Sequence, residues 1–118
     1  MRTIQTNPAA FMTSATEMIQ RMPQAFDAEA ARDLTMTVQY MIEEPMYVVV
    51  DAGHCNVHHG IAETPDVTLR IRGDHLVKLM TGRMRGITAF LTGKLRVEGN
   101  MMLAQKLQQV FDRDKLVG

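Results

Sequence analysis

Three of the four histidines and the only cysteine, side chains that could bind a metal ion or attack a substrate, lie in one short segment. Residues 51–59 read DAGHCNVHH and hold an acid, three histidines and the chain's only cysteine. We expect a turn followed by a strand here, in which side chains alternate between faces and residues four apart are separated by about 13 Å. Cys55 and His59 therefore share a face but cannot bind one zinc ion, whose ligand atoms lie about 2 Å from the metal. The spacing predicts no metal site.

Catalysis by a nucleophile or an acid–base pair is disfavoured by similar geometry. His54 is adjacent to Cys55 but would point to the opposite face of the strand, so it cannot activate the thiol. Glu43 and Glu44 form another pair of titratable groups, and they lie at an expected turn where water would keep both ionised. The sequence therefore predicts no catalytic residue, and no pattern in it predicts a cofactor.

Length and composition limit the class of protein to which this chain can belong. The chain has 118 residues, of which 46% are hydrophobic and 22% charged, and these values predict a single domain over residues 1–118. A lone cysteine excludes an intramolecular disulfide, and neither a signal peptide nor a membrane-spanning run is visible, so we predict a cytoplasmic location. A formal net charge of zero and few aromatic side chains argue against nucleic acid as a partner.

The elements that must position these residues follow from hydrophobic periodicity. Asn7-Pro8 predicts the start of a helix over about 8–22, which Pro23 should end or kink. A helical turn is expected near 26–33. Strict alternation then predicts strands over 34–42, 46–50 and 55–62, joined by short turns into an antiparallel meander, and a fourth strand over 66–72.

The second half of the chain reads as two short helices, a strand and a helix. Asp74 is expected to cap the first helix, and Gly82 and Gly93 to follow the ends of the two. A fifth strand is expected over 94–99, after which Asn100 caps a final helix with an apolar stripe through Leu103, Leu107, Val110 and Phe111. This order predicts a two-layer α+β domain with helices on one face of the sheet.

Two features of the composition leave alternatives open. The chain has 11 methionines, which suit variable apolar ligands but also serve as ordinary core filling. Residues 70–97 hold seven Lys or Arg against one acid, either as a solvated face or as a dock for anionic lipid or an acidic partner. Within that segment Arg83 and Arg85 lie in the expected loop between the two short helices. We predict that they contact the surface of an anionic membrane.

A series of short motifs follows residue 64 in a fixed order. An alternating strand comes after Pro-Asp, and then come a helix ending in Gly, a helix ending in Gly-Lys, a strand ending in Gly and an apolar helix. The matching positions are Pro65-Asp66, Gly82, Ala89-Phe90, Gly93-Lys94, Gly99 and Leu107. This order resembles the sterol carrier protein 2 family, and with the preceding strands the resemblance covers about residues 26–111. Asn100 stands where the family usually has Asp, a conservative change for a helix cap.

The resemblance implies a five-stranded, mostly antiparallel sheet covered on one face by helices, with a hydrophobic tunnel between the layers. The apolar side chains of the later helices exceed what one sheet face needs, and we expect a lipid to contact them. The predicted tunnel residues are Met80, Met84, Ile87, Phe90, Leu91, Met102, Leu103, Leu107, Val110 and Phe111.

The resemblance also implies the kind of function. We predict noncatalytic binding and transfer of an apolar lipid, such as a fatty acid, an acyl conjugate, a sterol-like lipid or an isoprenoid quinone. Burying an acyl chain supplies enough free energy without polar catalysis. The alternative is an accessory module that presents lipid to a partner enzyme, or that forms a homodimer.

Overall fold

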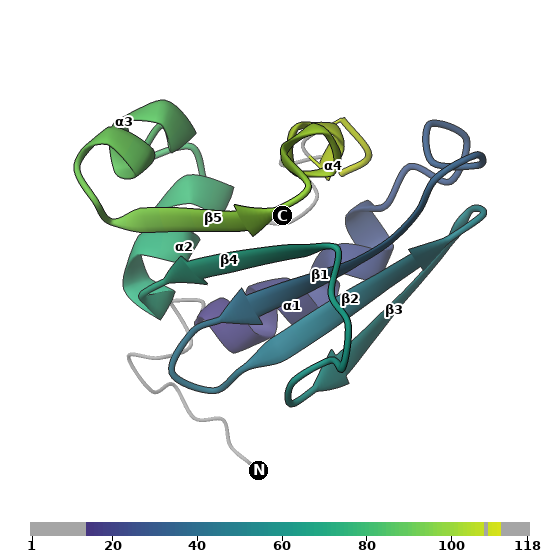
Figure 1. Cartoon of the computed structure of the whole chain (residues 1–118), viewed down its shortest axis with the longest axis horizontal. Helices are drawn as coiled ribbons and strands as arrows, with labels where there is room; N and C mark the ends of the chain where they lie inside the picture. Colours follow the sequence, from purple (N-terminus) through teal and green to yellow (C-terminus); the bar gives the residue numbers. More distant parts are fainter. Residues whose placement is uncertain (1–13, 108, 112–118) are drawn as a thin grey trace, which may run out of the picture.

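A computed structural model describes residues 14–107 and 109–111 of the chain (Figure 1). The described residues form five strands and four helices, which confirms the predicted α+β class. In chain order the elements are α1 (Ala15–Ala25), β1 (Thr35–Met41), β2 (Met46–Asp51), β3 (His54–His59), β4 (Val67–Ile71), α2 (Gly73–Met80), α3 (Gly86–Leu91), β5 (Leu95–Gly99) and α4 (Met101–Leu107).

The strands form one sheet in the order β3-β2-β1-β4-β5. The predicted meander is confirmed, since β1, β2 and β3 are antiparallel neighbours. β4 lies on the other side of β1 and runs parallel to it, and β5 is antiparallel to β4. The sheet is therefore mostly antiparallel, with one parallel pair at its centre.

Several hydrogen bonds of Asp66 hold β4 in its parallel position beside β1. The Asp66 carboxylate accepts the Thr37 N–H at 2.8 Å, and its own N–H donates to the Thr37 carbonyl at 2.9 Å. The Asp66 carbonyl accepts the Asn100 N–H and lies against Gly99, where any added Cβ would collide with it. Gly99 also has a φ of +99°, which favours glycine. The Asp and Gly of the sequence motifs thus join β1, β4 and β5.

One face of the sheet carries the core, as the alternation predicts. Val38, Val48 and Val67 are cross-strand neighbours in the centre of that face, and all three are fully buried. α1 covers β2 and β3 through Met18 and its neighbours on one side of the helix, which are also buried. In Figure 1 α1 runs behind β1 and β2, so this half of the domain is covered.

Among the described residues, the opposite face has one buried polar side chain, Gln39. Its amide nitrogen donates to the carbonyls of Met46 and Gly60, and its amide oxygen accepts the Ala62 N–H at 2.7 Å. Burial is tolerated because both ends of the amide are bonded. These bonds hold the start of the β3–β4 connection against this face, where the sequence pattern suggested only an exposed strand position.

The bounds of α1 contradict one of the two outcomes predicted for Pro23, an end of the helix, while the other, a kink, stays a prediction. α1 begins after Ser14, whose hydroxyl oxygen accepts the Glu17 N–H, and it continues past Pro23 to Ala25. Pro23 does not stop the helix because it lies exposed in the last turn, where its missing N–H removes a single hydrogen bond. The predicted start at Asn7-Pro8 lies outside the described residues.

The predicted cap of α2 is also wrong. α2 begins at Gly73, and the backbone N–H of Gly73 donates to the Glu43 carboxylate at 2.9 Å. Asp74 instead forms an ion pair with Arg72 at 3.1 Å. A carboxylate from the β1–β2 turn therefore occupies the position at the helix N-terminus where negative charge is stabilising. The predicted helix end is confirmed, because Gly82 follows α2 with a φ of +79°.

The last helix begins as predicted and is shorter than predicted. The Asn100 side chain accepts the N–H groups of Met102 and Leu103, so it caps α4. The described helix ends at Leu107, and Phe111 forms a β-bridge with Phe26 instead of extending the apolar stripe of α4. The two rings lie 5.5 Å apart. Phe111 therefore contacts Phe26 at the end of α1 and is not part of α4.

Candidate functional site

The half of the core face formed by β4 and β5 is less completely covered than the half under α1. Leu69 pairs directly with Val97, and both side chains are only partly buried. Leu95, opposite Ile71 in the same ladder, is also partly buried. α3 contacts β5, and α4 contacts both β4 and β5, so short helices adjoin this apolar row (Figure 1).

The helices next to this row carry five of the six large apolar side chains that are exposed in the described part of the chain. On α3, Ile87 is 58% exposed, Phe90 47% and Leu91 74%, and on α4 Met102 is 70% exposed. Single exposed apolar residues are ordinary, but several on two short helices that both contact β5 make a candidate binding surface. α4 has no fully buried residue, so its apolar side chains lack the cover that those of α1 have.

The ten predicted tunnel residues fall into three groups by burial. Four are exposed, as given above, and one is buried in the core, Val110. The remaining five are partly buried: Met80, Met84, Leu103, Leu107 and Phe111. Of these, all but Met84 pack against the core cluster. The tunnel itself stays a prediction.

Sequence reasoning missed four apolar residues of this region: Leu69, Leu95, Val97 and Met101. The three strand residues lie on the core face, and the alternation that predicts β4 and β5 could have identified them. Met101 is 50% exposed directly after the Asn100 cap. It adds a further apolar side chain to the exposed part of α4.

The sequence profile of the SCP-2 sterol transfer family matches residues 15–112. This chain belongs to that family. The predicted resemblance is therefore confirmed, together with the general class of an SCP-2 lipid-binding or transfer domain. The family match identifies neither the ligand nor the partners of this SCP-2 domain.

Individual relatives match parts of this SCP-2 domain. Sterol carrier protein 2 of Bos taurus is 49% identical over 45 residues, which are 38% of this chain and 8% of that protein. Hydroxysteroid dehydrogenase-like protein 2 of Homo sapiens is 36% identical over 59 residues, which are 49% of this chain and 14% of that protein. The chain therefore spans only a small share of these curated relatives.

A solved structure shows the same fold over nearly its full length. Sterol carrier protein 2 like 2 from Aedes aegypti superposes with a TM-score of 0.68 at 24% identity, and the match covers 82% of this chain and 93% of that one. Within the described part of this SCP-2 domain, no helix has the length and apolarity needed to cross a membrane.

The histidine- and cysteine-bearing segment lies away from β4 and β5, on edge strand β3. Cys55 faces the core, while His58 lies on the other face and stacks on Tyr47 with ring centroids 4.9 Å apart. Among residues 14–107 and 109–111, no three His, Cys, Asp or Glu side chains gather closely enough to hold a metal ion.

Burial also makes the Cys55 thiol a poor nucleophile. It raises the pKa of Cys55 from 9.0 to about 11, because an apolar environment disfavours the thiolate. The pKa of the buried Tyr40 hydroxyl is raised well above its ordinary value, chiefly by burial and then by the nearby Cys55. Both groups are therefore neutral at physiological pH.

Two arginines precede α3. Arg83 and Arg85 are exposed, and neither forms an ion pair with any residue that the structure describes. Residues 75–97 contain no acidic residue, so α3 lies within a segment that carries only positive charge. Apolar side chains and unpaired cations thus occur side by side at this end of the SCP-2 domain.

Proposed function

We propose that this SCP-2 domain binds an apolar lipid between the β4–β5 half of the sheet and the helices beside it, and transfers that lipid without chemical change. The observation that carries the proposal is the pairing of a partly covered apolar row on β4 and β5 with exposed apolar side chains on α3 and α4. A lipid chain would cover both. Nine of the ten predicted residues are the proposed contacts; Val110 is left out because its side chain is buried in the core.

The free energy of burial is sufficient for such a ligand. An acyl chain of about 16 carbons, at about 0.8 kcal/mol per methylene, offers on the order of 10 kcal/mol before ordering costs. No polar group is required for affinity, so fatty acids, acyl conjugates, sterol-like lipids and isoprenoid quinones all fit. The name of the bovine relative, a sterol carrier protein, supports this class of ligand.

The protein surface around α3 supports peripheral contact with an anionic membrane. Ile87 and Leu91 are largely exposed, and Arg83 and Arg85 lie just before them in the chain. Apolar side chains that enter the headgroup region and cations that attract anionic lipid act together in such contacts. A cytoplasmic single domain, meeting membranes only at their surface, is the form of the protein that we propose.

A second candidate is an accessory module that presents lipid to a partner enzyme or forms a homodimer. Hydroxysteroid dehydrogenase-like protein 2 carries an enzyme's name, and the matched segment is a small part of it. Exposed Met101 and Met102 on α4 are adaptable contact residues for such a partner. A change in lipid uptake when the partner is added would favour this candidate over a free carrier.

Lipid extraction and binding test the main proposal. Native mass spectrometry of the purified protein should reveal a bound lipid, and fluorescent fatty acids, sterols or quinone analogues should bind at micromolar protein. The extracted lipid should be chemically unchanged after prolonged incubation, since no catalysis is proposed. Failure of all three ligand classes to bind a folded protein would overturn the proposal.

A further inference from the structure

The two edges of the sheet, β3 and β5, are covered differently. In Figure 1 α3 and α4 stand beyond β5, on the side away from β4, and both helices contact that strand. Among the described elements, none lies beyond β3 in the same view, and β3 pairs with β2 only. An uncovered edge strand presents unpaired backbone N–H and C=O groups, which can pair with another strand.

The hydrogen-bond pattern between β2 and β3 is set at both ends of their ladder. At one end Ala52-Gly53 forms a two-residue turn in which both φ angles are positive, so Asp51 and His54 are its hydrogen-bonded closing pair. At the other end the Gly60 N–H donates to the Pro45 carbonyl at 2.8 Å. Both ends therefore indicate that the even-numbered residues of β3 bond to β2.

The odd-numbered residues of β3 have their backbone groups directed away from the sheet. Hydrogen-bonded and non-hydrogen-bonded pairs alternate along an antiparallel ladder, so the residues between the bonded pairs turn their N–H and C=O groups to the other side. These residues are Cys55, Val57 and His59. None of their outward backbone groups bonds to a residue that the structure describes.

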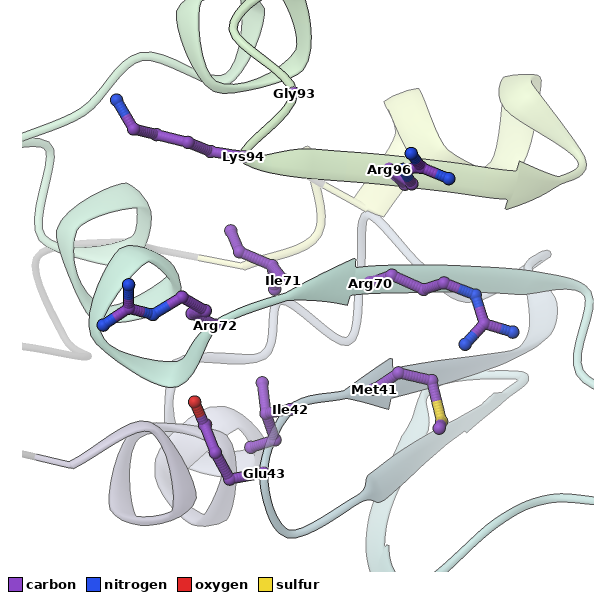
Figure 2. Close-up of a pocket in the computed structure, with 9 residues that line it drawn as sticks. All are labelled: Met41, Ile42, Glu43, Arg70, Ile71, Arg72, Gly93, Lys94 and Arg96. Carbon is purple, nitrogen blue, oxygen red and sulfur yellow. The ribbon is translucent and has the colours of Figure 1, made fainter.

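β3 also lacks the features that usually block an open edge, which are charged side chains, proline and β-bulges. Residues 52–62 contain no Asp, Glu, Lys, Arg or Pro. The register of β3 with β2 is one-to-one from His54 to His59, so no bulge interrupts it. β5, in contrast, carries Arg96 and follows Lys94, and both side chains are drawn on that strand and at its start in Figure 2. Of the two edges, β3 is the one suited to pairing.

We propose that β3 pairs antiparallel with β3 of a second copy of this chain, so that the two five-stranded sheets become continuous. In a register centred on Val57, Val57 faces its own counterpart, and Cys55 faces the second copy's His59. Every outward N–H and C=O group of the three residues then has a partner. The same surface is used by both copies, so the pairing closes as a dimer with two-fold symmetry.

The side chains are compatible with this register. On the open face Asn56 lies opposite the second copy's His58, and both are exposed polar groups that can hydrogen-bond. On the core face the two Val57 side chains meet at the symmetry axis, and each is only partly buried within its own domain. Their contact removes further apolar surface from water. No pair in the register places two formally charged side chains opposite one another.

A second β3 fits this edge better than β5 of another copy does. Pairing of β3 with β5 would be head-to-tail and would extend into a filament, and α3 and α4 stand beyond β5 where the next copy would have to lie (Figure 1). The interface gives the homodimer named above a defined surface. It does not rest on the lipid-binding proposal, because β3 lies at the opposite edge of the sheet from the lipid contacts on α3 and α4.

Sedimentation equilibrium of the whole chain tests the dimer. From low micromolar to submillimolar protein, the mass should rise from 13.3 kDa towards twice that value. His59→Pro should weaken dimerisation about tenfold or more, because it removes an intermolecular donor from each copy. Proline is tolerated on an edge strand where the N–H faces solvent, so circular dichroism of this variant should match that of the wild type.

A charge exchange tests the register. Asn56→Lys with His58→Lys should give a monomer, because it places lysines opposite one another across the axis, and Asn56→Glu with His58→Glu should do the same. A mixture of the two variants should form a mixed dimer. The control Gln105→Lys with Gln109→Lys adds the same charge at exposed positions outside β3 and should dimerise like the wild type.

Three results would overturn the proposal: a wild-type chain that stays at 13.3 kDa, assemblies larger than a dimer, or the absence of a mixed dimer. Hydrogen exchange adds a separate readout. The amides of Cys55, Val57 and His59 should become more protected as protein concentration rises, whereas protection independent of concentration would mean that another segment of the same chain covers β3. Lipid uptake by the monomeric lysine variant should equal that of the wild type, so the dimer and the lipid site can fail separately.

Discussion

Replacing Phe90 by alanine is the sharpest test of where the lipid lies. Phe90 is on α3 and 47% exposed, so about half of its surface is free to contact a ligand. Ile61, at 66% exposed in the β3–β4 connection, serves as the control because it is more available to solvent than Phe90 but belongs to no helix beside β5.

The expected loss of affinity follows from the exposed area. A phenylalanine side chain of about 200 Å² with roughly half exposed offers about 90 Å² to a lipid. At about 25 cal/mol per Å² its removal costs about 2 kcal/mol of binding free energy, or about thirtyfold in Kd. The packed half of the ring should contribute a similar amount to the free energy of unfolding, about 2 kcal/mol.

Displacement of a fluorescent fatty acid gives the Kd, and urea denaturation gives the free energy of unfolding. Phe90→Ala should weaken binding while Ile61→Ala leaves it unchanged, and Met84→Ala should have a smaller effect because its side chain is partly buried. A folded Phe90→Ala protein with the wild-type Kd would refute the placement of the lipid, as would an equal loss for Ile61→Ala.

Four other predictions concern separate parts of the molecule. Leu107→Asp should abolish lipid uptake, since a charge in the apolar layer is costly to desolvate, and normal uptake by the folded variant would place the lipid elsewhere. Arg83→Glu with Arg85→Glu should slow transfer from anionic vesicles and leave affinity in solution intact, whereas rates indifferent to this reversal and to salt would make the arginines a solvated surface only. Because the pKa of Cys55 is about 11 in the folded protein and 9.0 ordinarily, alkylation at pH 8 should be slower than in urea and should accelerate as pH rises. The raised pKa of Cys55 also adds to the free energy of unfolding below pH 9.0, and this contribution is lost as pH rises toward 11. Rapid alkylation of the folded protein at pH 8 would contradict the burial of the thiol. Glu43→Gln should cost about 1 kcal/mol in urea denaturation by weakening the contact with Gly73, and an unchanged midpoint would show that this contact contributes nothing.

Periodicity predicted the strands well because their burial is local in sequence. Alternation from Leu34 to Ile42 reports which side chains face the core, and the structure confirms that face. The neighbours of β1 could not be derived in this way, because its parallel pairing with β4 depends on contacts such as Thr37 with Asp66, 29 residues apart. The predicted cap of α2 failed for the same reason, since the carboxylate at the start of α2 comes from Glu43 in a distant turn.

The sequence predicted which apolar residues belong to the candidate site, but it could not predict how exposed each of them is. The apolar stripes of the helices identified Phe90 and Met102 as ligand contacts, which remains a proposal, while their exposure comes from the structure. Val110 shows the limit of a stripe, because its backbone carbonyl accepts the Asp27 N–H and its side chain is buried in the core. A helical wheel cannot distinguish an apolar residue that packs on another element from one left available to a ligand.

The uneven covering of the sheet has an evolutionary consequence. The half under α1 holds most of the fully buried side chains, and substitutions there would cost a large part of the small stability that a domain of this size possesses. α3 and α4 bury little, so substitutions on these helices should alter the shape and width of the proposed lipid site at small cost in stability. Selection can therefore vary ligand preference in one half of the domain while the other half preserves the fold.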